Sequence, residues 1–362
     1  MKTAPSIDGA VGPHPEGWGA ALAVRSPGAA VASAGPGASA ATAAADAALS
    51  APETPVPGVQ AIYSPIEGEM ASFEAELDRV IQDAPPFLRE ELTHVLRGGG
   101  KRLRPALVLL AGSLYPGRTA TLISMALGYE LLHTATLVHD DTIDNAVTRR
   151  GRLTVNRIWG DSHAVMLGDY LCGCSAMMTA GTGSLQAMEI FSRALADLCG
   201  GAAAERVVRS SQGRQGYFST ISRKTASLFA AATESGALLS RAPAKAVRTM
   251  RAYGYSLGMA FQTLDDICDY RSDMSQGGIT LPAILLLEQP RNRPVADLLD
   301  RDPPAALNAL VEMVADSGVL EKCRRIALDF CGQARTGLRG LPPGPVRDSL
   351  DSLVVYIMDQ KA

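Results

Sequence analysis

The sequence predicts an all-α protein, and three features of the chain support this fold class. From about Met70 onward, apolar residues recur at steps of three and four, which is the period of a helix with one buried face. Few stretches alternate between apolar and polar residues as strands do. Glycine and proline residues interrupt the helical pattern at intervals typical of helix ends. No repeat with a period of about 20 to 50 residues is visible, which disfavours a solenoid.

The first 64 residues differ from the rest of the chain. They are dominated by Ala, Gly, Pro and Ser and hold almost no large aliphatic residue to bury. This composition predicts a disordered tail over residues 1–64 and a globular domain over residues 65–362. A targeting peptide is the alternative, but the segment offers only Lys2 and Arg25 as positive charges and no apolar stretch before a cleavage site.

Glycine and proline residues divide the domain into roughly ten helices. Apolar residues at 131–138 and at 259–264 precede two groups of aspartates, and we expect both stretches to be helices that end at the rim of the core. The breaks between helices fall at Gly98–Gly100, Pro116–Gly117, Gly181–Gly183, Gly200–Gly201, Gly277–Gly278, Pro303–Pro304 and Pro342–Pro343.

The composition of the 362 residues excludes several classes of protein. With 47% hydrophobic and 20% charged residues, the chain is too apolar to be wholly disordered and long enough for an enzyme-sized core. A net charge of −3 and 5% aromatic residues do not suit a nucleic-acid binder. No apolar run reaches the roughly 18 residues that cross a bilayer, so we expect no transmembrane segment. Six cysteines without a CxxC pair predict reduced thiols in a cytoplasmic protein.

The same acidic pattern, D-D-x-x-D, occurs twice. We call Asp140, Asp141 and Asp144 the first aspartate cluster, and Asp265, Asp266 and Asp269 the second aspartate cluster. On a helix, residues four apart share a face, with Cβ atoms about 5 to 6 Å apart. Mg²⁺ prefers one or two carboxylates together with substrate phosphates. Two such helices facing one another would bind a diphosphate through bridging Mg²⁺ ions.

A solvated acidic helix face is the alternative for each cluster. For a chain with this aspartate content, two such matches arise by chance in only about three chains per thousand. The apolar residues before each cluster weaken the alternative further, because carboxylates at the rim of a core need metal ions or cationic partners.

These motifs resemble those of the trans-prenyltransferases, the polyprenyl diphosphate synthase family, over nearly all of residues 65–362. The resemblance implies the isoprenoid synthase fold, an antiparallel helix bundle around a central cavity, assembled as a homodimer. It also implies head-to-tail condensation of isopentenyl diphosphate with an allylic diphosphate. Besides the aspartate clusters, the similarity rests on GGKRLRP at 99–105, HTATLVH at 133–139, RRG at 149–151, GDYL at 168–171, KTA at 224–226, FQTL at 261–264 and TLP at 280–282.

The resemblance also implies a role for each site residue. The allylic diphosphate would be held by Mg²⁺, three ions in all, on Asp140, Asp144 and Asp265, with Asp141, Asp266 and Asp269 in support. Arg149, Lys224 and Gln262 would contact that diphosphate, with Thr225 beside it. The diphosphate of isopentenyl diphosphate would be held by Lys101, Arg104, His133 and Arg150.

The reaction itself requires positive charge at the site. When diphosphate leaves an allylic carbon, a carbocation and a highly charged anion form, so metal ions and guanidinium groups must stabilise the anion. Arg149 and Arg150 follow the first cluster closely, and the planar fork of arginine suits phosphate oxygens.

Product length in this family depends on side chains one turn before the first cluster. Short-chain synthases carry aromatic residues there, whereas this sequence has Ala135 and Thr136. Tyr129 lies on the same helical stripe eleven residues before Asp140, about 16 Å along the helix, which leaves room for roughly three or four isoprene units. We therefore expect a product of C20 or longer. Packing is the alternative role for Tyr129.

The loop after the second cluster departs from the family pattern. Two lysines that usually follow the cluster are absent, Gly278 stands where the last one belongs, and Arg271 is a candidate substitute for one of them. Two alternatives to chain elongation therefore stay open. One is a class I terpene cyclase, which would not need Lys101, Arg104 and His133. The other is a regulatory subunit of a heteromeric prenyl synthase.

Overall fold

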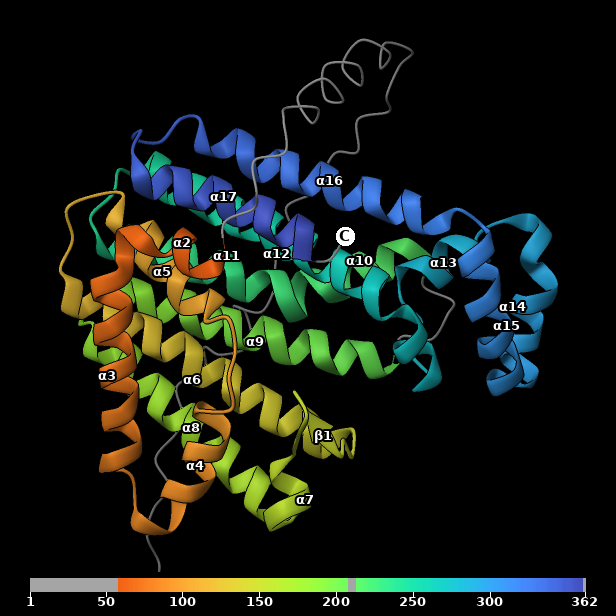
Figure 1. Ribbon diagram of the computed structural model, residues 1–362, viewed down its shortest axis with the longest axis horizontal. Helices are drawn as coiled ribbons and strands as arrows, with labels where there is room; N and C mark the ends of the chain where they lie inside the picture. Colours follow the sequence, from red (N-terminus) through yellow and green to blue (C-terminus); the bar gives the residue numbers. More distant parts are fainter. Residues whose placement is uncertain (1–57, 208–212, 361–362) are drawn as a thin grey trace, which may run out of the picture. The chain divides into compact units, whose positions relative to one another are not determined.

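The computed structural model describes residues 58–207 and 213–360, and within these ranges the all-α prediction is confirmed. The described strands form a single two-stranded hairpin, β1 (Thr148–Arg149) and β2 (Arg152–Leu153), and helices make up the other regular structure (Figure 1). The hairpin joins α6 (Thr119–Ile143) to α7 (Val155–Trp159).

A central set of long helices builds the core. α6 packs along α8 (Asp161–Gly181), and α11 (Ser227–Leu239) packs against both α5 (Leu103–Ser113) and α12 (Ala244–Ser275). α9 (Leu185–Val207) lies against α11 and against the short η4 (Ser222–Ala226), which follows α10 (Gly213–Ile221) (Figure 1). η4 thereby contacts both α9 and α12.

The remaining elements pack around this core. At the amino-terminal side they are α2 (Val59–Ile62), η1 (Ser64–Ile66), α3 (Glu67–Asp83), η2 (Pro86–Leu88) and α4 (Arg89–Leu96). At the carboxyl-terminal side they are α13 (Leu281–Leu287), η5 (Pro290–Asn292), α14 (Arg293–Arg301), α15 (Pro303–Asp316), α16 (Val319–Leu338) and α17 (Pro345–Gln360). α16 packs along α12, and α17 packs against α16 (Figure 1).

The regular structure begins earlier than the boundary expected at residue 65. α2 starts at Val59, and Ile62 and Tyr63 are both buried in the main core. The Tyr63 hydroxyl also donates a hydrogen bond of 2.8 Å to the carbonyl oxygen of Lys101. Residues 59–64 therefore belong to the domain, because apolar burial and this hydrogen bond hold them against it. The sequence did not predict this, since the segment before them is dominated by Ala, Gly, Pro and Ser. The rest of the predicted tail, residues 1–57, lies outside the described residues.

α6 is the helix of the described chain that is long and apolar enough to cross a bilayer by length and composition. Its most apolar window is 72% buried inside the protein, as in a core helix. Tyr129 and Leu131 are fully buried, and the helix packs against neighbours on several sides. Burial on most of its surface explains why the helix is apolar nearly all round.

The expectation that both aspartate clusters end their helices holds only for the first. α6 ends at Ile143, and Asp144 is its C-cap residue. α12 instead continues past the second cluster to Ser275. The reason is that Tyr270 and Met274 are buried against α13 and α15, so the apolar face of α12 extends beyond Asp269.

Candidate active site

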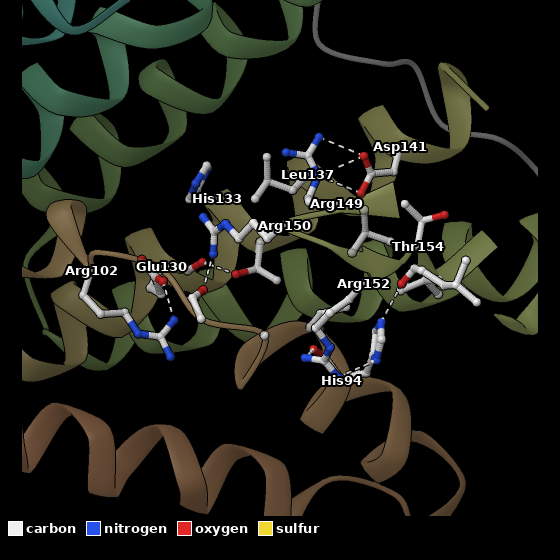
Figure 2. A pocket seen from close by; sticks show the side chains of 17 residues that line it. His94, Arg102, Glu130, His133, Leu137, Asp141, Arg149, Arg150, Arg152 and Thr154 are labelled. Atoms are coloured by element: carbon white, nitrogen blue, oxygen red, sulfur yellow. Dashed lines mark hydrogen bonds and ion pairs between the residues drawn. The ribbon is translucent and has the colours of Figure 1, made fainter. Parts of the chain in front are cut away.

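A strongly basic pocket lies between α4, α6 and the hairpin. It encloses about 610 Å³ including its open mouth. Two carboxylates, of Glu130 and Asp141, face the same space. The excess of positive charge predicts an anionic ligand. We call this the basic pocket, and its cationic or imidazole side chains are His94, Arg102, His133, Arg149, Arg150 and Arg152 (Figure 2).

The hairpin turn places two of these arginines. Arg150 and Gly151 form the turn, and both have positive φ angles, of 51° and 74°. A left-handed arginine costs backbone energy, and such strain is concentrated at functional sites. Arg149 forms hydrogen bonds of 2.8 to 2.9 Å with the Asp141 carboxylate, while the Arg150 guanidinium donates to the carbonyl oxygen of Gly99 (Figure 2). Consecutive arginines thus contact different parts of the site.

His133 and Arg104 lie within electrostatic reach of the same arginines. Burial, reinforced by Arg104, Arg150 and Arg149, lowers the pKa of His133 well below its usual range, so the imidazole is neutral at pH 7. The Arg104 guanidinium lies 5.1 Å from the ring centroid of Phe229, and burial lowers its pKa to about 10. Its buried Nε has no acceptor among the described residues. A buried donor beside other cations suits an incoming anion.

Arg102 anchors the floor of the basic pocket. Its guanidinium donates to Glu130 at 2.6 Å, to Glu74 at 2.9 Å and to the carbonyl oxygen of Leu96 at 2.7 Å. Burial alone would lower the pKa of Arg102, but Glu130 and Glu74 outweigh that effect and raise it. Sequence reasoning assigned no role to Arg102 or Glu130, because their pairing joins α5 to α6 and is not visible in local spacing.

The first aspartate cluster lies where α6 ends. Asp141 is buried, Asp140 is half-buried and Asp144 is exposed. Burial raises the pKa of Asp140, and the neighbouring carboxylates of Asp144 and Glu205 raise it further, while Lys224 and Arg149 oppose this. Asp140 is therefore a carboxylate crowded by other negative charge.

The second aspartate cluster is divided between the interior and the solvent. Asp266 is buried and accepts hydrogen bonds from the Tyr217 hydroxyl at 2.7 Å and from Gln262 Nε2 at 2.8 Å. Gln262 Oε1 accepts in turn from the Thr225 hydroxyl at 2.8 Å. Burial raises the pKa of Asp266 to about 7. This chain of hydrogen bonds fixes the orientation of Thr225 and Gln262, whereas Asp265 is half-buried and Asp269 is exposed.

Lys224 lies on the π-helical turn η4, a form often found at functional sites. Its ammonium group forms an ion pair with Glu205 on α9. Burial alone would lower the pKa of Lys224, but Glu205, Asp140 and Asp144 raise it. The close approach of α9 to η4 depends on Gly201, where a Cβ atom would lie 2.6 Å from the backbone nitrogen of Lys224.

Glu205 links the two aspartate clusters. Its charge raises the pKa of Asp140 on α6 and that of Asp266 and Asp273 on α12. Both clusters therefore lie within electrostatic reach of one carboxylate. Neither Glu205 nor Tyr217 was singled out from the sequence. Both precede Lys224 in the chain, and no motif or spacing pattern identified either residue.

The donor set fits hard divalent cations. Among the described residues, no three His, Cys, Asp or Glu side chains converge into a complete metal site. Mg²⁺ does not need one, because it binds through one or two carboxylates and completes its shell with water and phosphate oxygens. Burial is the main cause of the raised pKa values of Asp140 and Asp266, and neighbouring carboxylates add to it, so a divalent ion bound nearby would favour the charged form of both groups.

Two of the residues predicted to bind diphosphate have other partners in the structure. Lys101 does not line the basic pocket, and its Nζ lies 5.1 Å from the ring centroid of Tyr356. Arg271 is directed toward Glu312 on α15, with 3.6 Å between Nη1 and Oε1, so it does not replace a missing lysine in this conformation. In both cases the local sequence does not determine the direction of the side chain.

The chain-length residues are on α6 as expected. Ala135 and Tyr129 are fully buried and Thr136 is half-buried. The Tyr129 hydroxyl is 2.9 Å from Ser235 Oγ on α11, and its ring centroid is 5.6 Å from that of Phe191 on α9. Tyr129 is thus held by two neighbouring helices.

A family model described as Polyprenyl synthetase matches residues 85–313. The chain belongs to this family. A heptaprenyl diphosphate synthase component 2 from Geobacillus stearothermophilus is 33% identical over 314 residues, which cover 83% of this chain and 98% of the relative. A chloroplastic solanesyl diphosphate synthase 2 from Arabidopsis thaliana is 28% identical, over 83% of this chain and 77% of the relative.

The fold comparison agrees with the family assignment. A polyprenyl synthase from Caulobacter crescentus, solved with calcium and isoprenyl diphosphate, superposes with a TM-score of 0.79 at 28% identity, over 86% of this chain and all of that one. The chain therefore has the isoprenoid synthase fold and is a prenyltransferase. The resemblance inferred from the sequence motifs is confirmed.

Proposed function

We propose that this chain catalyses the Mg²⁺-dependent head-to-tail condensation of isopentenyl diphosphate with an allylic diphosphate, giving a product of C20 or longer. One observation carries the proposal. The Arg149–Asp141 ion pair connects the basic pocket directly to the first aspartate cluster. A metal-chelated diphosphate suits the acidic side, and a second diphosphate suits the basic side.

In this mechanism Asp140, Asp144 and Asp265 would hold Mg²⁺, which supplies positive charge to the leaving diphosphate. Lys224 and Arg149 bind the same diphosphate and stabilise its developing charge. The Tyr217–Asp266–Gln262–Thr225 hydrogen bonds keep Thr225 and Gln262 in place beside it. These bonds make Asp266 a positioning residue in this proposal, and Asp269 supports the cluster from solvent.

On the basic side, Arg104, Arg150 and His133 bind the diphosphate of isopentenyl diphosphate, and Lys101 joins them only after its side chain turns away from the Tyr356 ring. The unpartnered Nε of Arg104 supports this role. Arg150 has to exchange the Gly99 carbonyl for a phosphate oxygen. The neutral His133 can gain a proton from the ligand or from solvent when the anion enters.

The proposed product length rests on small side chains at Ala135 and Thr136 and on Tyr129 deeper along α6. The relatives named heptaprenyl and solanesyl diphosphate synthases, and a decaprenyl diphosphate synthase from Rhodobacter capsulatus at a TM-score of 0.77, agree with a long product. We place the floor of the growing chain at the Tyr129–Phe191 contact.

We further propose a cytoplasmic homodimer. All six cysteines are free, as expected for a reducing compartment. α8 exposes the apolar side chains of Val165, Met166 and Met177, and Leu185 at the start of α9 is 86% exposed. An apolar patch of this kind on adjacent helices favours association with a second copy. Sedimentation of the purified chain tests this, and a monomer at micromolar concentration would contradict it.

A regulatory subunit is the second candidate. The relative named heptaprenyl diphosphate synthase component 2 favours considering it, as does the loss of two lysines in the loop after Asp269. Both aspartate clusters and Lys224 are nevertheless present, which supports a catalytic chain.

The experiment is a product assay on the purified chain with an allylic diphosphate and Mg²⁺, with and without isopentenyl diphosphate. We expect polyprenyl diphosphates only with isopentenyl diphosphate. Hydrocarbon formed without it would identify a terpene cyclase instead, and no product from the chain alone would favour the regulatory subunit. Asp140→Ala should lower turnover by orders of magnitude with the fold retained, and chelation of divalent ions should do the same.

A further inference from the structure

Glu205 belongs to neither aspartate cluster, yet it contacts the cation that the proposed mechanism assigns to the allylic diphosphate. It lies near the end of α9 and forms an ion pair with Lys224. The Glu205 side chain is 52% exposed and that of Lys224 is 32% exposed, so both groups are accessible to a ligand entering the site. A carboxylate and a diphosphate oxygen would compete for the same ammonium group.

The surroundings of Glu205 make this competition stronger. The charge of Glu205 raises the pKa of Asp140 on α6 and the pKa of Asp266 and Asp273 on α12, so it adds negative charge within reach of both acidic helices. Lys224 is the cation that opposes it directly. An incoming diphosphate must therefore displace Glu205 from Lys224.

We propose that Glu205 is an internal counter-ion that occupies Lys224 when the site is free, and that it thereby sets the affinity for the allylic diphosphate and promotes release of inorganic diphosphate. This inference rests on the proposed function only for the identity of the substrate. Glu205 acts through Lys224 and is a positioning residue, not a catalytic one.

The geometry explains why such a carboxylate would be useful. Release of diphosphate from Mg²⁺ and Lys224 is required after each condensation, and a carboxylate that reclaims Lys224 favours that release. It also disfavours diphosphate binding before Mg²⁺ has neutralised the acidic helices. Glu205 therefore couples occupancy of Lys224 to the state of the metal site.

The test measures binding of inorganic diphosphate with Mg²⁺ by calorimetry to the full-length chain and to Glu205→Gln. Partly exposed ion pairs contribute about 0.2 to 1 kcal/mol, which corresponds to binding roughly one and a half- to fivefold tighter in the variant. In steady-state kinetics, the KM for the allylic diphosphate should fall by the same factor, while the KM for isopentenyl diphosphate stays unchanged. Glu205→Asp, which keeps the charge, should remain nearer to wild type.

Glu189→Gln is the matched control. Glu189 is an exposed carboxylate on the same helix, and its ion pair with Arg193 at 2.5 Å lies away from Lys224. We expect no change in diphosphate binding or in either KM. Thermal unfolding of both variants shows whether the substitutions leave the fold intact.

A double-mutant cycle with Lys224→Met tests whether Glu205 acts through Lys224. If Glu205 acts through Lys224, Glu205→Gln should have no further effect on diphosphate binding in the Lys224→Met background. Equal effects with and without Lys224, or weaker binding in Glu205→Gln, would overturn the proposal. A wild-type chain that binds diphosphate but forms no polyprenyl product would instead refute the proposed function, because the binding measurement does not need turnover.

Discussion

Removing the guanidinium of Arg102 should destabilise the protein far more than removing that of Arg97, although both pair with Glu74. The Arg102–Glu130 pair is nearly buried, with side-chain exposures of 13% and 9%, whereas Arg97 is 36% exposed. Arg102→Ala leaves the Glu130 carboxylate without its cation and frees the carbonyl oxygen of Leu96.

The expected magnitude follows from that burial. Breaking a buried pair by removing one partner costs about 3 to 5 kcal/mol, since the remaining charge is left uncompensated. An unfolding entropy of about 2.1 cal/mol/K per residue over roughly 300 residues is about 0.6 kcal/mol/K, so this cost corresponds to a fall in melting temperature of roughly 5 to 8 °C. Arg97→Ala should cost no more than about 1 kcal/mol, because exposed ion pairs contribute little.

The assay is thermal and denaturant unfolding of the two variants and of Arg102→Ala combined with Glu130→Gln. Neutralising Glu130 removes the uncompensated charge, so the double variant should recover part of the lost stability. Equal destabilisation by Arg97→Ala and Arg102→Ala would refute the reasoning. So would a double variant no more stable than Arg102→Ala alone, because burial of an unpaired carboxylate would then not be the cause.

Three further predictions concern the site itself. Gly201→Ala should lower turnover by about tenfold or more, because a Cβ atom there would shift η4 and with it Lys224; steady-state kinetics would measure this. Tyr129→Ala should lengthen the product, as seen by mass spectrometry, whereas Tyr129→Phe removes only the hydrogen bond to Ser235 and should leave the product length unchanged. The folded-state pKa of His133 is depressed from 6.5, so the unfolded chain takes up a proton first on acidification. The stability present above pH 6.5 should therefore be lost as the pH falls, by up to about 1.4 kcal/mol per pH unit, and His133→Gln should remove that part in pH-dependent unfolding.

Each of these has a control or a contradicting result. Gly200→Ala is matched to Gly201→Ala, because a Cβ atom at Gly200 would lie at an ordinary 3.7 Å from Arg223 Nη1, and equal losses in both would contradict the close-packing argument. An unchanged product spectrum in Tyr129→Ala would assign that residue to packing alone. Identical pH profiles of stability in the wild type and His133→Gln would show that the pKa of His133 is not lowered in the folded protein.

The sequence was sufficient to predict the all-α class, the family and the residues of both aspartate clusters. These depend on features that are local along the chain, since helical periodicity and the i, i+4 spacing of carboxylates repeat within a few residues. Arg149 and Arg150 were also predictable from local sequence. They follow the first aspartate cluster within a few residues, at the hairpin turn that Arg150 and Gly151 form.

What only the tertiary structure decided is how those residues are partnered. Lys224 binds Glu205 across 19 residues of sequence, Tyr217 binds Asp266 across 49, and Tyr129 meets Ser235 across 106. Such pairings depend on how helices rotate and pack against one another, and the spacing within any one helix does not encode that rotation. The same reason explains why α12 runs past Asp269 and why Arg271 faces α15, since buried contacts of Tyr270 and Met274 with distant helices determine both.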